Sequence, residues 1–395
     1  MTACRVLLRG DGWGLPGPLE LREPVEVLEV AGDRPEGLPA LLSRLDAVAS
    51  SGRPERLAAG FLTYEAGVAL EGSAGLFRPP PTPLAWFGIF DLASASPSGP
   101  ADDLPPTPSE SAVPFAPGGE LDLPAWTAAV REIRSGIEAG DVYQANLTRR
   151  VVRELKVPHR ALADRLWEDN PVPYAILVET GSVSVVSNSP ELFLDADLRS
   201  RRVASAPIKG TAARLAGGSE EAAIAWLLAS EKDAAEHLMI VDLIRNDLGR
   251  VCEAGSVHVP AFRRVRTFRH LHHLESTVAG TLRAGAGVSD LLRATLPGGS
   301  ITGAPKRASL GFIRRLEPSP RGPYTGAAGW VRGDGRVVLN VAIRTAVAAA
   351  GAVAYHAGGG IVWDSDPLFE WQEAETKSRE FFRALAAGAG ESEVP

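Results

Sequence analysis

The chain has 395 residues, 45% of them hydrophobic and 23% charged, which is the balance of a folded globular protein and not of a disordered one. Its formal net charge is -7, and no basic stripe is interleaved with aromatic residues, so a nucleic-acid-binding groove is not expected. No run is apolar and long enough for a signal peptide or a bilayer span, so we expect a cytoplasmic protein without a membrane partner. The two cysteines, Cys4 and Cys252, argue against a disulfide framework, a cysteine zinc site and a glutaminase nucleophile.

The chain divides by composition into a first folded region, a linker and a second folded region. Residues 1–94 alternate short apolar runs with Gly/Pro turns, and they include a predicted helix over residues 39–48 and a strand that leads into residues 60–67. Residues 95–122 are dense in proline, serine and glycine, which predicts a linker or a long surface loop. We expect residues 123–388 to form the second region and residues 389–395 to be a tail.

The second region mixes strands and helices without regular alternation. An amphipathic helix is predicted over residues 126–139, and residues 174–179 and 182–187 read as a hairpin. Residues 219–248 are helical with a break near Ser230, which can cap a second helix. Residues 327–349 predict two strands, a third strand follows through residue 355, and Asp366-Pro367 opens the last helix. This order favours an α+β fold with a mostly antiparallel sheet core flanked by helices.

Lysine is rare in this chain. Of the 41 basic residues only five are lysines, and the others are arginines. Among cationic side chains only lysine readily becomes a neutral amine in a protein, so each lysine is a stronger candidate for chemistry than usual. Lys209 lies in a turn bounded by proline and glycine, 18 positions after Glu191, and an ordinary surface lysine is the alternative reading.

Two groups of acidic residues have helical spacing. Glu370, Glu373 and Lys377 fall on one face of the last helix, and Asp233 and Glu236 lie one turn before four consecutive apolar residues. Clusters of carboxylate oxygens favour Mg²⁺ over zinc, and a nearby lysine suits an anionic ligand. A solvated face with ion pairs is the alternative for the last helix.

A glycine-rich turn and a histidine pair are further candidates. Residues 298–306 lack the Gly-Lys-Ser/Thr ending of a phosphate loop, but a turn with the hydroxyls of Ser300 and Thr302 can present amides to a carboxylate. An ordinary tight turn explains it equally well. His272 and His273 are adjacent in an extended segment, so their side chains point to opposite faces and only one of them is expected to serve a site.

Taken together, these blocks resemble the chorismate-utilising enzymes, a family that includes anthranilate, aminodeoxychorismate, isochorismate and salicylate synthases. The resemblance covers about residues 126–385, and a weaker N-terminal motif of the family matches GFLTYEAG (60–67). The blocks in chain order are GDVYQANLTR (140–149), SPELFL (189–194), PIKGT (207–211), DAAEHLMIVDLIRNDLGRV (233–251), HHLEST (272–277), PGGSITGAPK (297–306), IRTA (343–346), GGGIVWDSDP (358–367) and EWQEAETK (370–377).

The resemblance implies a fold and a set of site residues. Residues 1–94 would be an N-terminal region of the component I type, and residues 123–388 a chorismate-binding catalytic domain with the two-sheet fold of anthranilate synthase component I. Glu191 would be the general acid, Lys209 the nucleophile and His273 a neighbour of the substrate ring. The implied Mg²⁺ ligands are Glu236 and Glu373, with Asp233 and Glu370 close by. The implied substrate-binding residues are Gly210, Thr211, Ser300, Thr302, Tyr324, Arg344, Gly359 and Lys377.

Two positions distinguish the reactions of the family. Members that add water carry a lysine where this chain has Gln144, and aminodeoxychorismate synthases typically carry a lysine at the position of Lys209. The resemblance therefore implies amination of chorismate at C4 through Lys209, with ammonia from a glutamine amidotransferase subunit. The alternatives are the anthranilate-forming reaction and a non-catalytic binding subunit. Because attack needs a neutral amine, we expect burial and the metal to lower the pKa of Lys209.

Overall fold

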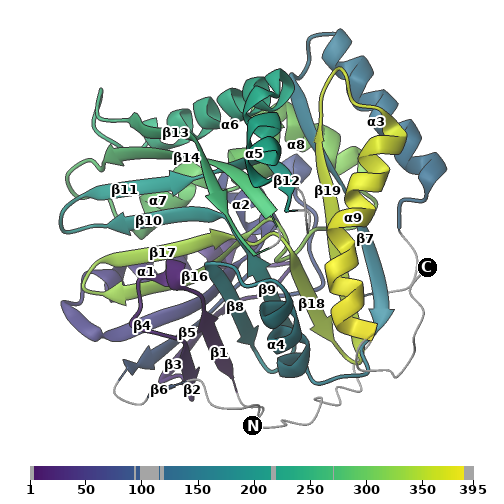
Figure 1. Ribbon diagram of the computed structural model, residues 1–395. Helices are drawn as coiled ribbons and strands as arrows, with labels where there is room; N and C mark the ends of the chain where they lie inside the picture. Colours follow the sequence, from purple (N-terminus) through teal and green to yellow (C-terminus); the bar gives the residue numbers. More distant parts are fainter. Residues whose placement is uncertain are drawn as a thin grey trace.

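Two antiparallel sheets carry the strands of the chain (Figure 1). The computed structural model describes residues 4–92, 95–97, 115, 120–214, 219–269 and 271–386. Within these residues the first sheet runs, in spatial order, through β15 (Gly303–Ala304), β7 (Gln144–Glu154), β19 (Ala352–Ile361), β18 (Thr345–Ala349), β9 (Ser184–Ser189), β8 (Tyr174–Glu179), β1 (Arg5–Arg9), β2 (Leu19–Arg22) and β6 (Ser96–Pro97). The second runs through β12 (Ile208–Ala213), β14 (Leu271–Thr281), β11 (Arg202–Ala206), β10 (Leu192–Asp197), β17 (Arg336–Val341), β16 (Ala327–Gly333), β4 (Arg53–Leu62), β5 (Ala85–Asp91) and β3 (Glu26–Val30), and β13 (His258–Thr267) pairs with β14.

The helices cover the outer faces of these sheets. They are α1 (Leu38–Ala49), α2 (Tyr64–Leu70), α3 (Leu123–Glu138), α4 (His159–Asp169), α5 (Glu220–Ala229), α6 (Glu231–Gly249), α7 (Val288–Thr295), α8 (Lys306–Leu316) and α9 (Pro367–Ala386). Short 3-10 turns are η1 (Asp11–Trp13), η2 (Pro35–Gly37), η3 (Ala74–Leu76) and η5 (Gly299–Ile301). In Figure 1, α9 lies along β19 and β7, while α5 and α6 lie beside β12 and β14. No helix in the described residues is long and apolar enough to cross a membrane.

Three large apolar clusters show the layer order. One lies between the two sheets and contains Trp13, Trp86 and Trp330. A second lies between the first sheet and helices α3, α4, α8 and α9, and a third lies between the second sheet and helices α1, α2, α6 and α7. The protein is therefore built of two packed sheets with helices outside, which confirms the predicted α+β fold class.

Most predicted elements are present with small shifts. The helix predicted over residues 39–48 is α1, the hairpin is β8–β9, and the break at Ser230 separates α5 from α6. The Ser230 side chain accepts a hydrogen bond from the amide of Asp233, as a helix cap does. One prediction is wrong in detail, because residues 327–349 hold three strands and not two. The strand that leads into residues 60–67 is β4, and the helix α2 follows it.

The first 94 residues do not form a separate layer. Strand β1 pairs with β8, and β4 pairs with β16, so strands from both sides of the predicted linker share each sheet. The predicted linker over residues 95–122 falls largely outside the described residues, apart from its short strand β6, Phe115 and the end that leads into α3.

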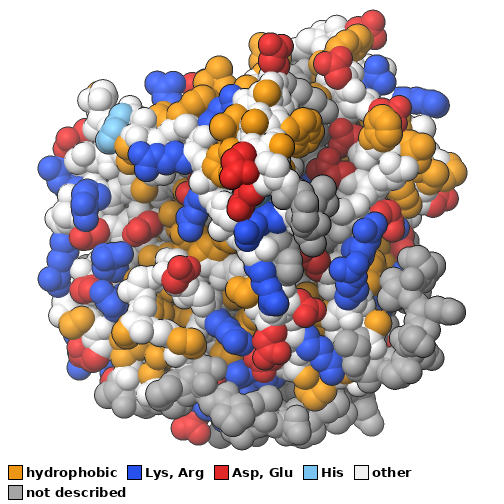
Figure 2. Space-filling model, viewed as in Figure 1, with side chains coloured by type: hydrophobic (Ala, Val, Ile, Leu, Met, Phe, Trp, Pro, Cys, Tyr) orange, Lys and Arg blue, Asp and Glu red, His pale blue; other side chains and the backbone are white. Residues whose placement is uncertain are grey.

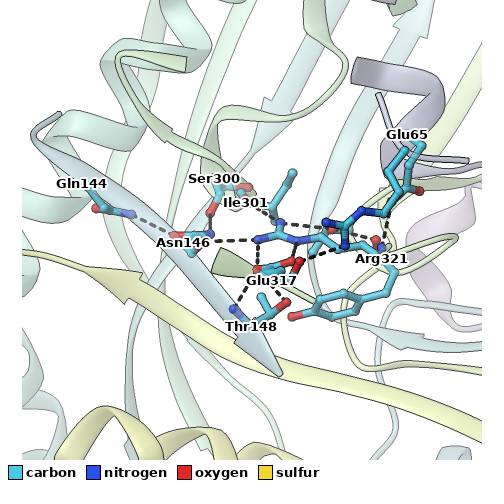
Figure 3. A network of polar contacts seen from close by, with 11 residues as sticks. Glu65, Gln144, Asn146, Thr148, Ser300, Ile301, Glu317 and Arg321 are labelled. Atoms are coloured by element: carbon cyan, nitrogen blue, oxygen red, sulfur yellow. Dashed lines mark hydrogen bonds and ion pairs between the residues drawn. The ribbon is translucent and has the colours of Figure 1, made fainter. Parts of the chain in front are cut away.

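A buried ion pair connects several of these elements (Figure 3). The Arg321 guanidinium donates to both carboxylate oxygens of Glu317, at 2.8 and 2.7 Å, and to the backbone carbonyls of Ile301 and Asn146. The Glu65 carboxylate accepts the backbone amide of Arg321 at 2.7 Å, which ties α2 to the same loop. Both side chains of the ion pair are almost fully buried, so neither charge can be left without its partner.

We expect the Arg321→Met substitution to lower the free energy of unfolding by about 3–5 kcal/mol, because it leaves the Glu317 carboxylate buried without a cation. Urea denaturation followed by tryptophan fluorescence measures the change. The matched control is Arg315→Met, since Arg315 pairs with Glu132 in an exposed ion pair, and we expect it to change stability by less than about 1 kcal/mol. Equal effects of the two substitutions would contradict the importance of the buried pair.

Candidate active site

Lys209 lies on β12 with its side chain against helix α6. Its ammonium forms an ion pair with the carboxylate of Glu236, which α6 holds in a buried position. The next residue on α6, His237, contacts the backbone carbonyl of Lys209 at 3.0 Å and the Ser276 hydroxyl at 2.6 Å. Two consecutive residues of α6 therefore fix both the side chain and the backbone of Lys209.

The pKa of Lys209 is raised above its ordinary value, whereas burial together with a bound metal predicts a lowered pKa. Burial by itself lowers the pKa, but the carboxylates of Glu236, Glu373 and Asp233 outweigh burial. The amine is thus held as an ammonium while these carboxylates are not engaged elsewhere. The same interactions show that acids from α6 and α9 converge on Lys209, although they are more than 130 positions apart in the sequence.

Gly210, Thr211 and His273 lie next to Lys209. The predicted turn at Lys209 and Gly210 is part of strand β12, with an irregular register between Ile208 and Thr211. Gly210 has a φ of 96°, in the left-handed region, and an added Cβ would approach a Leu227 methyl at 3.2 Å, so this position favours glycine. The Thr211 hydroxyl and His273 Nδ1 are 2.8 Å apart. Burial, with a contribution from the Arg344 guanidinium, lowers the pKa of His273 to about 4. His273 is therefore a neutral imidazole near neutral pH, and the other predicted histidine, His272, is directed elsewhere to Thr267.

Glu191 lies between β9 and β10 and contacts the first residue of β12. Its carboxylate accepts a hydrogen bond from the Ser300 hydroxyl at 2.8 Å and one from the backbone of Ile208, the residue before Lys209. Burial raises the pKa of Glu191 to about 7, against the opposing effect of the Ser300 hydrogen bond. A carboxyl that is half-protonated near pH 7 is suited to donate a proton to a departing oxygen.

Helix α9 presents the predicted acidic stripe to the glycine run of β19. The Lys377 ammonium lies 2.6 Å from the Glu373 carboxylate and 2.8 Å from the backbone carbonyl of Gly358. Glu370 is buried and accepts a hydrogen bond from Ser365 at 2.6 Å. A Cβ added to Gly359 would come within 3.5–3.7 Å of the charged ends of Glu370, Glu373 and Lys377. Glu373 and Lys377 form an exposed i,i+4 ion pair, as the solvated-face alternative predicts, whereas Glu370 is buried and all three side chains approach Gly359.

The donor chemistry of this region fits a hard divalent cation. The four acids predicted as ligands are all carboxylates, and Gly359 leaves open the space that a Cβ would fill between two of them. No group of three or more His, Cys, Asp or Glu side chains is already arranged around a metal position in the part of the chain that the structure describes. Figure 2 shows acidic side chains set back from the surface between α5 and α9.

Arg344 lies in the loop after β17, and Tyr324 lies in the loop before β16. Arg344 has a φ of 50°, and its guanidinium lies 3.6 Å from the Glu380 carboxylate. Its charge contributes to the lowered pKa of His273, which places the guanidinium near that imidazole. Tyr324 is buried and stacks on His356, with ring centroids 5.1 Å apart and planes 8° from parallel.

Thr302 does not join this group. Its side chain is fully buried, and its hydroxyl donates to the carbonyl of Gly298, so it stabilises the glycine-rich turn from within. The same turn orients Ser300, whose backbone carbonyl accepts a hydrogen bond from the Asn146 side chain at 3.1 Å. The ordinary-turn reading thus describes Thr302, and the ligand-facing reading remains for Ser300.

Sequence reasoning missed several supporting residues. Asn146 and His237 lie inside two of the sequence blocks that resemble the family. Their positions next to Gln144 and Glu236 could have identified them as candidates. Lys306 forms two 2.8 Å contacts with the Asp247 carboxylate, and both residues also lie inside blocks. Arg321 carried no signal, because it is one of many arginines and lies outside every block.

The chain is similar in sequence to known proteins. The sequence pattern of the chorismate binding enzyme family matches residues 25–383. Anthranilate synthase component 1 of Haloarcula marismortui is 39% identical over 303 residues, which are 76% of this chain and 61% of that protein. Aminodeoxychorismate synthase component 1 of Bacillus subtilis is 38% identical over 291 residues, 73% of this chain and 60% of that protein. This chain therefore spans about 60% of the length of these two relatives.

The solved structures agree on the fold. Anthranilate synthase component I from Streptococcus pneumoniae has a TM-score of 0.75 and 26% identity, with 93% of this chain and 92% of that chain covered. The menaquinone-specific isochorismate synthase from Escherichia coli shares the fold, with a TM-score of 0.71 and 19% identity over 97% of this chain and 88% of that chain. The match over most of its length shows that this chain belongs to the family of chorismate binding enzymes.

Proposed function

We propose that the chain aminates chorismate with ammonia to form 4-amino-4-deoxychorismate. The observation that carries the proposal is the position of Lys209, one of the few lysines of the chain. Lys209 interacts with the acids of α6 and α9. The residue before it in the sequence donates a backbone hydrogen bond to Glu191. In the first step the Lys209 amine forms a bond to the ring, the C4–oxygen bond breaks, and the oxygen leaves as water with a proton from Glu191. In the second step ammonia forms a bond at C4 and displaces Lys209.

Substrate binding in this proposal requires cationic groups. Chorismate is a dianion, and the chain is acidic overall, so local cations must hold both carboxylates. Lys377 and the amides of Gly210 and Thr211 would hold the ring carboxylate, while Arg344 and Tyr324 would hold the enolpyruvyl carboxylate. Mg²⁺ on Glu236 and Glu373, with Asp233 and Glu370 close by, would neutralise the acids that now keep Lys209 protonated and would bind the ring carboxylate.

The second candidate is the anthranilate-forming reaction, which uses the same substrate and also releases pyruvate. Relatives of both kinds match this chain at nearly equal identity, so the comparisons favour neither. The contacts of Lys209 favour the first candidate, because direct attack of ammonia on the ring gives no reason for a lysine at that point. A non-catalytic binding subunit would not require the buried acid Glu191 beside its hydroxyl donor Ser300.

The ammonia would come from a glutamine amidotransferase subunit. Neither cysteine of these 395 residues is placed as a glutaminase nucleophile, since the Cys4 thiol donates to the carbonyl of Thr180 and Cys252 is buried with its pKa raised to about 11 by burial. We expect the purified chain to turn over chorismate with ammonium and not with glutamine. Chromatographic assay of product with each nitrogen source measures this, and glutamine-dependent turnover by the purified chain would contradict it.

We expect Lys209→Ala to lower product formation by about 10²-fold or more at limiting ammonia, because the covalent route is lost. Chorismate binding should persist, since the carboxylate-binding residues remain. In the wild type without ammonia, mass spectrometry should find a ring adduct on the peptide that contains Lys209. The control is Lys156→Ala, which removes an exposed lysine. Full activity of Lys209→Ala at limiting ammonia, with no adduct in the wild type, would refute the nucleophile assignment.

The pH dependence of kcat/KM tests Glu191. As a general acid it must be protonated, so activity should fall as pH rises above about 7, where its carboxyl ionises. Ser300 donates a hydrogen bond that lowers this pKa, so Ser300→Ala should move the fall in activity to higher pH. Glu191→Gln should lose most activity and show no such fall. If kcat/KM of Ser300→Ala falls at the same pH as that of the wild type, the titrating group is not Glu191.

A further inference from the structure

Each lysine of the site contacts a carboxylate that the proposed function assigns to Mg²⁺. Lys209 forms an ion pair with Glu236, and Lys377 lies 2.6 Å from Glu373. The two acids stand on different helices, α6 and α9, and each has a lysine on the site side. These are two of only five lysines in a chain that otherwise uses arginine for its positive charge. The pairing is therefore not explained by a general excess of lysine on the surface.

We propose that Lys209 and Lys377 are internal counter-ions that occupy the metal site of the metal-free protein, so that Mg²⁺ binds by displacing both ammonium groups from Glu236 and Glu373. The inference rests on the proposed metal ligands and goes beyond them, because it assigns the two lysines a role before substrate arrives. The exchange conserves the local charge, because one Mg²⁺ ion replaces two ammonium groups at the same two carboxylates.

The two pairs differ in strength. The side chains of Lys209 and Glu236 are 26% and 7% exposed, whereas those of Lys377 and Glu373 are 42% and 56% exposed. Water screens the second pair and leaves the first pair as the stronger barrier to metal entry. Lys377 also donates to the carbonyl of Gly358, so it keeps a hydrogen-bond partner after it leaves Glu373.

Displacement has a consequence for the order of events. A lysine that holds Glu236 is not directed at the substrate ring, and one that holds Glu373 is not available to a ring carboxylate. Once a cation occupies the two acids, both amino groups are released beside Gly359 and Gly210, where the proposed substrate carboxylate would lie. Metal binding and preparation of the two lysines thus become one event.

The test is Mg²⁺ binding to the metal-free full chain without chorismate, measured by isothermal titration calorimetry. We expect Lys209→Met to bind Mg²⁺ about tenfold more tightly than the wild type, because its principal competitor is gone. Lys377→Met should gain about two- to fivefold, as suits an exposed pair. Lys209→Arg keeps a cation on Glu236 and should bind Mg²⁺ as weakly as the wild type. Lys156→Met, an exposed control, should not change the affinity.

The outcomes separate this inference from the proposed function. Equal Mg²⁺ affinity in the wild type, Lys209→Met and Lys377→Met would overturn the displacement model and leave the metal site intact. No saturable Mg²⁺ binding in any of these proteins would overturn the ligand assignment as well. Thermal unfolding of each variant confirms that it is folded, and the exposed Lys377→Met variant decides the question if Lys209→Met does not fold.

Discussion

The buried ion pair between Arg321 and Glu317 is the constraint on which the site depends. It lies where strand β7, the end of helix α8, the glycine-rich turn and the loop before β16 meet. The Arg321 guanidinium donates hydrogen bonds to groups of all four elements. Asn146, whose carbonyl it holds, in turn orients Ser300, and Ser300 donates to Glu191. A buried charge pair is expensive unless every group is satisfied, which here makes it a means of fixing position more than a source of stability.

The site itself balances many acids with few cations. Carboxylates from α6 and α9 form ion pairs with Lys209 and Lys377, and they raise the pKa of Lys209. The carboxyl of Glu191 has no cation beside it among the groups that shift its pKa, so burial raises that pKa and favours the neutral form. One region thus contains an amine whose pKa is raised by neighbouring carboxylates and an acid whose pKa is raised to about 7 by burial.

Local sequence signals predicted the parts of the fold that local interactions decide. The cap at Ser230 and the helix start at Asp366 were visible because a side chain bonds to an amide two or three residues away. The rarity of lysine pointed to Lys209 and Lys377. The raised pKa of Lys209 was not predictable, since its sign depends on how closely β12 approaches α6 and α9. Arg321 was hidden among the many other arginines, and only the three-dimensional contacts distinguish it.

The most direct test of the central claim is identification of the product. Purified chain, chorismate, Mg²⁺ and ammonium are incubated, and the product is identified by mass spectrometry while pyruvate is assayed in the same sample. The account predicts a product that has exchanged one hydroxyl for an amino group and retains the enolpyruvyl group, with no pyruvate released. Anthranilate formed together with an equal amount of pyruvate would contradict it.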